Sequence, residues 1–213
     1  MNKLDIINKT KQFVKVELSN EGSGHDWYHI ERVYNMSKYI AQKENADLFI
    51  VEMAALLHDI DDWKFSDKQD TTKTEQFLKS VNVDKVEFKK ILSIIKRISF
   101  KGGVVDSTQD SIEGMVVQDA DRLDAIGAIG IARAFTYGGF KNRVIYNPDI
   151  NPIEFKTLKD VKHKNNHTIN HFYEKLLKLK DLMNTNTAKE IAVKRHKFME
   201  KFLEEFYLEW DFK

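Results

Sequence analysis

The chain of 213 residues contains no cysteine. Disulfide bonds are therefore excluded, and so is every metal site that depends on thiolate ligands. Any metal ion bound by this chain must be held by nitrogen and oxygen atoms. The missing cysteines thus limit metal chemistry to ligands such as imidazole and carboxylate.

Long apolar runs are also missing. No stretch approaches the roughly 20 consecutive apolar residues that a membrane-spanning helix requires. The N-terminal segment MNKLDIINKTKQFVKVEL is charged and amphipathic, and it lacks the apolar block of a signal peptide. We therefore expect a soluble cytoplasmic protein without a membrane partner.

Neither sign of charge is in clear excess. The chain has 34 lysines and arginines and 33 aspartates and glutamates, which gives a net charge of +1. Such a balance gives no strong signal for a nucleic-acid partner or an anionic membrane. Hydrophobic residues make up 42% of the chain, which is enough for a sizeable core. The length fits one domain over residues 1–213.

Proline is scarce as well, since the only two, Pro148 and Pro152, lie in one segment. Elsewhere apolar residues recur at the i, i+3, i+4 and i+7 positions typical of helices, whereas strand-like alternation is rare. The expected helices cover about residues 4–18, 30–41, 48–58, 71–80, 84–97, 112–135, 158–182 and 187–208. The range 112–135 is apolar over most of its circumference, which predicts a central buried helix or helix pair. The predicted fold class is all-α.

One segment, Tyr137 to Thr157, contains both prolines and a Gly-Gly pair, and is predicted to be a long loop. Loops of this length in compact domains are often lids or binding loops. The two expected helices that follow the loop, 158–182 and 187–208, are both long.

Three apolar stretches each contain histidine or aspartate. They hold His29 in GHDWYHIERV, His58 and Asp59 in AALLHDIDDW, and Asp121 in VVQDADRLDAIG. Buried charges need a partner or a metal, and imidazole with carboxylate suits a borderline divalent cation. One cation held by all four groups would explain the set, with three helices each directing a ligand inward. The alternative is a pair of satisfied core histidines and an aspartate paired with a neighbouring arginine.

These stretches resemble the HD-domain superfamily of metal-dependent phosphohydrolases, in which a histidine, a His-Asp doublet and a distant aspartate hold the metal. The sequences of these stretches are similar to a small stand-alone branch of that superfamily, and so are the segments HFYEKLLKL and KRHKFMEKFLEEF near the C-terminus. The resemblance therefore covers nearly the whole chain. It implies one compact HD-type helical bundle, with the metal-site core at about residues 20–135 and a C-terminal helical extension at about 158–213.

By this resemblance, one divalent metal ion is held by His29, His58, Asp59 and Asp121. A single ion is implied because superfamily members with two metals add histidines between the doublet and the final aspartate, where this chain has none. Asp124, three residues after Asp121, is the alternative ligand. Manganese, cobalt, nickel, iron and magnesium are the candidate ions, although mixed nitrogen and oxygen ligation argues against magnesium as the tightest binder. The implied activity is phosphomonoesterase- or nucleotidase-like hydrolysis of a small phosphorylated substrate, such as a nucleotide, by a metal-activated water.

Charged residues beside the ligand positions are the candidates for catalysis and substrate binding. Asp61 and Asp62 follow the doublet, and Asp62 is the predicted general acid unless the pair lies in a solvated loop. His25 precedes the first ligand and could face a phosphate or support that ligand. Arg32 and Arg122 adjoin ligand positions, where a guanidinium could bind a phosphate or orient a ligand carboxylate. We assign Arg32 to catalysis and Arg122 to substrate binding.

Histidines near the C-terminal end of the chain allow two interpretations. His171 and Lys175 lie in the segment HFYEKLLKL, which resembles the family sequence. Both residues are predicted to border the substrate pocket. His163, His167 and His171 also form an i, i+4, i+8 stripe that could bind a second metal. The interleaved lysines and asparagines favour an exposed helix face instead.

Two other functions fit the same residues. A non-catalytic ligand-binding or regulatory HD module would retain a ligand without turning it over. A purely structural helical protein would bind no metal and would melt unchanged in chelator. The C-terminal aromatic residues recur at helical spacing, which suits core packing or the interface of a homodimer: Phe198, Phe202, Phe206, Tyr207 and Trp210.

Overall fold

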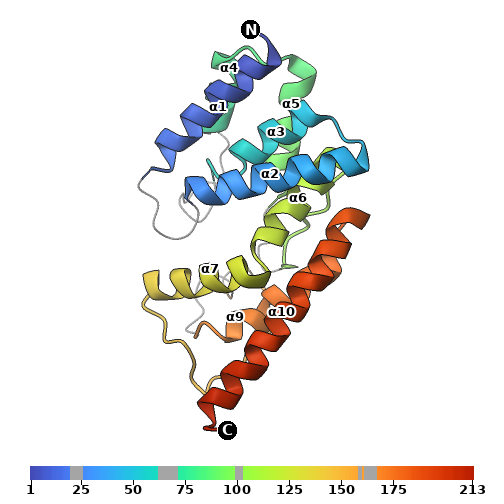
Figure 1. Cartoon of the computed structure of the whole chain (residues 1–213). Coiled ribbons are helices and arrows are strands. Elements are labelled where there is room, and N and C mark those ends of the chain that lie inside the picture. Colours follow the sequence, from blue (N-terminus) through green and yellow to red (C-terminus); the bar gives the residue numbers. More distant parts are fainter. Residues whose placement is uncertain (20–25, 62–71, 99–102, 158–159, 161–166) are drawn as a thin grey trace. The chain divides into compact units, whose positions relative to one another are not determined.

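The computed structural model describes residues 1–19, 26–61, 72–98, 103–157, 160 and 167–213. Every regular element in these ranges is a helix, which confirms the all-α prediction (Figure 1). The chain forms two compact units. The first comprises Met1–Phe100 and Asp106–Ala120, and the second comprises Lys101–Val105 and Asp121–Lys213. The organisation as a single domain stays a prediction.

The first unit is built on α3 (Leu48–Leu57), whose side chains are buried except at its first residue and at Glu52. Three helices pack against α3 (Figure 1): α1 (Lys3–Glu17), α2 (Trp27–Glu44) and α5 (Lys85–Lys96). α4 (Thr72–Ser80) is joined to α1 by Phe77, whose ring stacks on Phe13 with 4.3 Å between centroids. Full burial of an aliphatic side chain such as leucine contributes about 1.5–3 kcal/mol, so α3 contributes strongly to the stability of this unit.

Asp47 determines where α3 begins. Its side chain accepts hydrogen bonds from the backbone N–H groups of Phe49 (2.9 Å) and Ile50 (3.3 Å). We expect Asp47→Ala to lower the free energy of unfolding by about 1 kcal/mol, because two N–H groups at the start of the helix lose their acceptor. Asp47→Asn keeps an accepting oxygen and should lose little. Urea denaturation measures both values, and equal losses in the two variants would contradict the capping role.

The range 112–135, expected to be one helix or a helix pair, forms a pair: α6 (Ile112–Asp124) and α7 (Gly127–Phe140). The chain turns between them at Gly127, whose φ of 77° lies in the left-handed region that favours glycine. The boundary between the two units falls within α6. Its residues up to Ala120 belong to the first unit, and those from Asp121 onward belong to the second.

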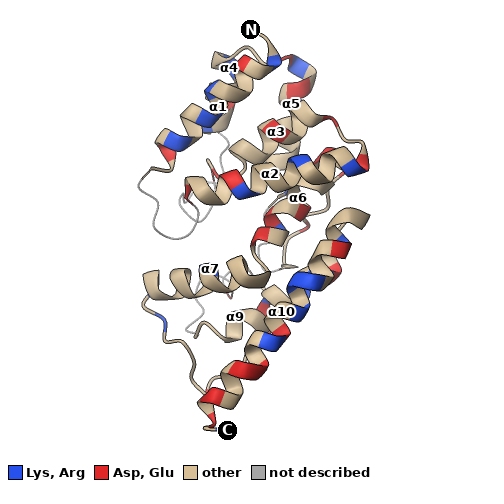
Figure 2. Ribbon diagram, viewed as in Figure 1, with Lys and Arg blue, Asp and Glu red and all other residues tan. Residues whose placement is uncertain are grey.

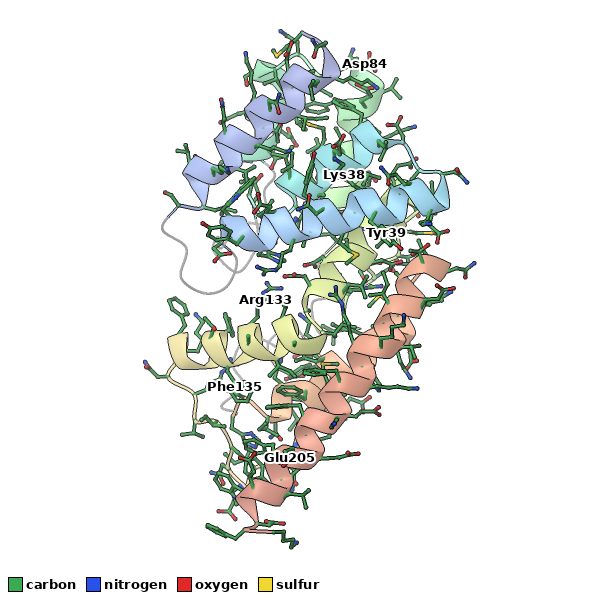
Figure 3. All side chains as sticks on the ribbon, in the orientation of Figure 1. Lys38, Tyr39, Asp84, Arg133, Phe135 and Glu205 are labelled. Carbon is green, nitrogen blue, oxygen red and sulfur yellow. The ribbon has the colours of Figure 1, made fainter. Side chains whose placement is uncertain are left out.

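In the second unit, α7 packs against α10 (Asn186–Trp210), which confirms the last predicted helix (Figure 1). Aromatic rings form this contact. Phe135 of α7, labelled in Figure 3, lies 6.0 Å from the ring of Phe202 and 6.2 Å from the ring of Phe172, between centroids. Phe172 and Phe202 stack on each other at 5.8 Å.

The helix expected over 158–182 is divided in its described part. A short helix, α9 (Asn170–Glu174), is followed by a 3-10 helix, η2 (Leu176–Leu182). Lys175 separates them with φ −137° and ψ −60°, outside the helical region. The prediction of one continuous helix over 158–182 is therefore wrong here, because the backbone of Lys175 leaves the helical conformation within a sequence of good helix formers.

The predicted loop over 137–157 begins later than expected, because α7 continues to Phe140. Its backbone is bonded to the residues before α9. The carbonyl of Val144 accepts from Thr168 N–H, and that of Ile145 accepts from Ile169 N–H, each at 3.1 Å. The loop is thus fastened within the second unit.

His167 also holds this loop. Its Nε2 lies 3.1 Å from the carbonyl oxygen of Ile150, to which Asn170 donates as well, at 2.8 Å. Its Nδ1 accepts from the backbone N–H of Asn170 at 3.2 Å. Both ring nitrogens therefore serve the local backbone, which counts against the metal stripe considered for His163, His167 and His171. His163 itself lies outside the described residues.

Charge is distributed unevenly over the helices of the second unit. α10 carries lysine, arginine and glutamate along its length, whereas Arg133 is the only charged residue of α7 (Figure 2). Within the described part of the chain, no helix is both long enough and apolar enough to cross a membrane.

Candidate metal centre

The two histidines predicted from the first unit lie side by side. His29 stands in the first turn of α2, which Asp26 caps by accepting from the His29 N–H at 2.9 Å. His58 is the residue that follows α3. Because α2 packs along α3, the two imidazoles are buried together, with ring centroids 5.3 Å apart and planes at 73°.

The protonation of His58 follows from its backbone contact. Nδ1 lies 2.8 Å from the carbonyl oxygen of Ala55, which can only accept a hydrogen bond. Nδ1 therefore carries the proton, and in the neutral ring Nε2 keeps its lone pair. A second nitrogen held by a backbone carbonyl is the usual arrangement of a metal-binding histidine.

Asp59 reaches both imidazoles. Its Oδ2 lies 3.3 Å from Nε2 of His29, and its Oδ1 lies 3.5 Å from Nε2 of His58. With its Nδ1 protonated, the neutral His58 ring has an acceptor at Nε2, and the Asp59 oxygen beside it is an acceptor as well, so this contact needs a cation, either a proton or a metal ion. Two imidazoles with one carboxylate suit a borderline divalent metal.

Asp121 joins the two histidines. One ligand atom each from His29, His58 and Asp121 all lie within 4.8 Å of one another. Ligand atoms on opposite sides of one ion are about 4.2 Å apart when each bond is about 2.1 Å, so small side-chain movements would suffice. These residues could hold one divalent metal ion, and their nitrogen and oxygen donors fit such an ion.

The other aspartate considered as a ligand, Asp124, has a different partner. Its Oδ2 accepts from Nη1 of Arg133 at 2.9 Å, and the carboxylate is buried. The geometry therefore favours Asp121 as the ligand from α6. Sequence reasoning missed Arg133, although a single charge in the apolar stretch GAIGIARAF is a usable signal.

Comparisons with known proteins identify the family of the chain. The sequence model of the HD domain matches residues 26–126, a range that contains all four predicted ligands. The uncharacterized protein YpgQ of Bacillus subtilis is 42% identical over 206 residues, covering 95% of this chain and 93% of YpgQ. The chain belongs to the HD-domain superfamily.

Solved structures extend the likeness to the fold of this HD-domain protein. An HD-superfamily hydrolase from Bacillus thuringiensis is 47% identical over the whole of both chains, with a TM-score of 0.77. A protein from Lactobacillus plantarum is 39% identical over 97% of each chain, with a TM-score of 0.88. YpgQ has been crystallised in complex with ADP, and that structure is 39% identical over 97% of this chain and 95% of YpgQ, with a TM-score of 0.77.

Two of the residues predicted for catalysis in this HD-domain protein, His25 and Asp62, lie outside the described residues. The third, Arg32, is half-buried in α2, three residues after His29. Asp61, which was considered beside Asp62, accepts from the backbone N–H groups at the start of α4 and therefore caps that helix. The catalytic roles of His25, Arg32 and Asp62 stay predictions.

The residues predicted for substrate binding lie in the second unit of the HD-domain protein. Arg122 is buried, and its Nη1 donates to the backbone carbonyl of Leu182, which links α6 to the end of η2. His171 in α9 and Lys175 directly after it are half-buried. The binding roles of these three side chains also stay predictions.

Proposed function

We propose that this HD-domain protein is a metal-dependent phosphohydrolase that acts on a small phosphorylated substrate, with nucleotides as the first class to examine. The observation that carries the proposal is the group formed by His29, His58 and Asp121, whose ligand atoms lie within 4.8 Å of one another. Two relatives support it: the HD-superfamily hydrolase of Bacillus thuringiensis, and YpgQ, whose crystal structure contains ADP.

A divalent ion bound at this group would lower the pKa of a water molecule toward neutrality and polarise a phosphoryl oxygen. Two groups of the chain position the histidines that would bind this ion. The carbonyl of Ala55 fixes the ring of His58, and Asp59 spans the two imidazoles. Burial of both rings keeps bulk water away, which strengthens electrostatic interactions with a phosphate.

The remaining roles in the proposal are those predicted from the amino-acid sequence. Asp62 would protonate the leaving oxygen, and Arg32 and His25 would assist at the phosphate. Arg122, His171 and Lys175 would bind the substrate. Manganese, cobalt, nickel and iron rank ahead of magnesium as the ion, because imidazole ligands favour these metals. A cytoplasmic location and a homodimer stay predictions.

The test begins with protein whose metals have been removed by a chelator. Mn²⁺ is then restored, and phosphate release is measured with nucleoside mono-, di- and triphosphates and with simple phosphate esters. We expect hydrolysis that appears with Mn²⁺ and disappears again in excess EDTA. Metal binding without turnover of any substrate would favour the ligand-binding module. No metal binding, with the same melting temperature in chelator, would favour a structural protein.

A further inference from the structure

Two aromatic residues begin α2, directly before the proposed metal ligand His29. Trp27 is the first residue of the helix and Tyr28 is the second. Their surroundings differ, because Nζ of Lys15 lies over the half-buried Trp27 ring, 4.5 Å from its centroid, whereas Tyr28 is 65% exposed. In the described part of the first unit, Tyr28 and Tyr39 are the exposed aromatic residues. The ring of Tyr28 is therefore accessible to a ligand.

The first two turns of α2 place Tyr28 beside His29. The two residues are consecutive, so their Cα atoms are about 3.8 Å apart, and their side chains leave the helix axis in directions that differ by roughly 100°. Arg32 follows Tyr28 by four positions and His29 by three, so it neighbours both on the helix surface. Helical side chains lean toward the N-terminus of their helix, which directs Arg32 toward this pair. These relations depend on α2 alone.

A nucleotide carries the groups that this arrangement can bind. Its phosphates suit a divalent ion and a guanidinium, and its base is a flat aromatic ring that one ribose separates from the phosphates. Every base offers a π-face, and an aromatic side chain is its usual stacking partner in proteins. With a phosphate on an ion held by His29, the base would lie beside that ligand at the helix surface, where the exposed ring of Tyr28 is found.

We propose that Tyr28 is a specificity-determining residue, whose ring stacks on the base of a nucleotide while a phosphate of that nucleotide binds at the metal ion. This inference rests on the proposed function, and it names nucleotides as the substrate class in preference to simple phosphate esters. Stacking requires no particular hydrogen-bond pattern, so purine and pyrimidine nucleotides should both bind. Purine nucleotides should bind more tightly, because their larger rings offer more area for stacking.

The test compares two ligands that differ only by the adenosine group: the methylene analogues of ADP and of pyrophosphate, which resist cleavage between their phosphorus atoms. Isothermal titration into Mn²⁺-saturated protein gives both dissociation constants. We expect Tyr28→Ala to weaken binding of the ADP analogue by about tenfold, and to raise the ratio of its Kd to that of the pyrophosphate analogue by a similar factor. Tyr28→Phe keeps the ring, so this ratio should stay within about twofold of the parent value.

Tyr39→Ala is the matched control on the same helix. Tyr39, labelled in Figure 3, is also exposed, at 49%. It follows Tyr28 by about three helical turns, which is roughly 16 Å along the axis of α2. Its ring is therefore beyond the reach of a base whose phosphate lies at His29, and both dissociation constants should equal those of the parent.

An unchanged ratio of the two Kd values in Tyr28→Ala overturns the inference, and so does an equal rise of this ratio in Tyr39→Ala. A similar rise in Tyr28→Phe overturns it as well, since the ring would then not be the group that binds the base. If Tyr28→Ala does not fold, Tyr28→Leu also removes the aromatic ring and decides in the same way.

The outcomes separate the role of Tyr28 from the proposed function. A parent protein that hydrolyses phosphate esters but does not bind the ADP analogue refutes base stacking and keeps the hydrolase. A parent protein that hydrolyses nothing, and whose Kd ratio rises in Tyr28→Ala alone, refutes the hydrolase and keeps the stacking role of Tyr28.

Discussion

Replacement of His58 by alanine is expected to remove tight Mn²⁺ binding and to lower phosphohydrolase activity by about a thousandfold. His58 offers one of the three ligand atoms that lie within 4.8 Å of one another, and its ring is already fixed by the Ala55 carbonyl. A metal ion contributes several kcal/mol to transition-state stabilisation, and each 1.36 kcal/mol corresponds to a factor of ten in rate. Metal content by mass spectrometry and initial rates of phosphate release measure the two effects.

The matched control is His196→Ala. His196 lies on α10 in the second unit, where its Nε2 is 3.2 Å from Glu200. This variant also loses one histidine, but it should keep the metal content and the activity of the parent. Loss of the metal in His58→Ala without loss of hydrolysis would show that the reaction does not use this ion. Retention of both would place the metal elsewhere.

The largest loss of stability is expected for Gly130→Ala at the corner between α6 and α7. A Cβ at this position would lie 2.2 Å from the carbonyl oxygen of Ala125 and 2.4 Å from its carbonyl carbon. These are backbone atoms, so the corner itself would have to open to admit the methyl group. We expect a loss of more than about 3 kcal/mol in the free energy of unfolding, measured by urea denaturation.

Gly139→Ala provides the comparison on the same helix. A Cβ at position 139 meets no atom within 4 Å. Since alanine is favoured over glycine inside a helix by roughly 1 kcal/mol, this variant should be as stable as the parent or slightly more stable. A small loss in Gly130→Ala, similar to that in Gly139→Ala, would mean that the corner can relax.

Much of the fold could be predicted because the apolar spacing and the burial agree. The same periodicity that predicts α2 and α3 puts His29 and His58 on their buried faces, and the two helices then pack together. Asp121 is buried less than its neighbours, yet its place one turn after Val117 was enough to predict its direction.

Other features depend on contacts that a linear pattern does not contain. Phe172, Leu176 and Leu179 are buried at a helical spacing, which fits a continuous helix as well as the observed break at Lys175. Tertiary packing overrides local propensity there. The pair of Asp124 and Arg133 was missed for a similar reason, because its two residues lie nine positions apart on two successive helices.

A metal ion bound at the end of the buried helix α3 would also stabilise the folded chain. His58 is attached to the end of the helix on which the first unit is built, so an ion that binds His58 also restrains that helix. A ligand that binds only the folded chain adds RT ln(1 + [L]/Kd) to its stability, about 2.7 kcal/mol when its free concentration is 100 times Kd. When metal ions are scarce in the cell, the protein would then lose both its activity and this contribution to its stability, and its lifetime would shorten.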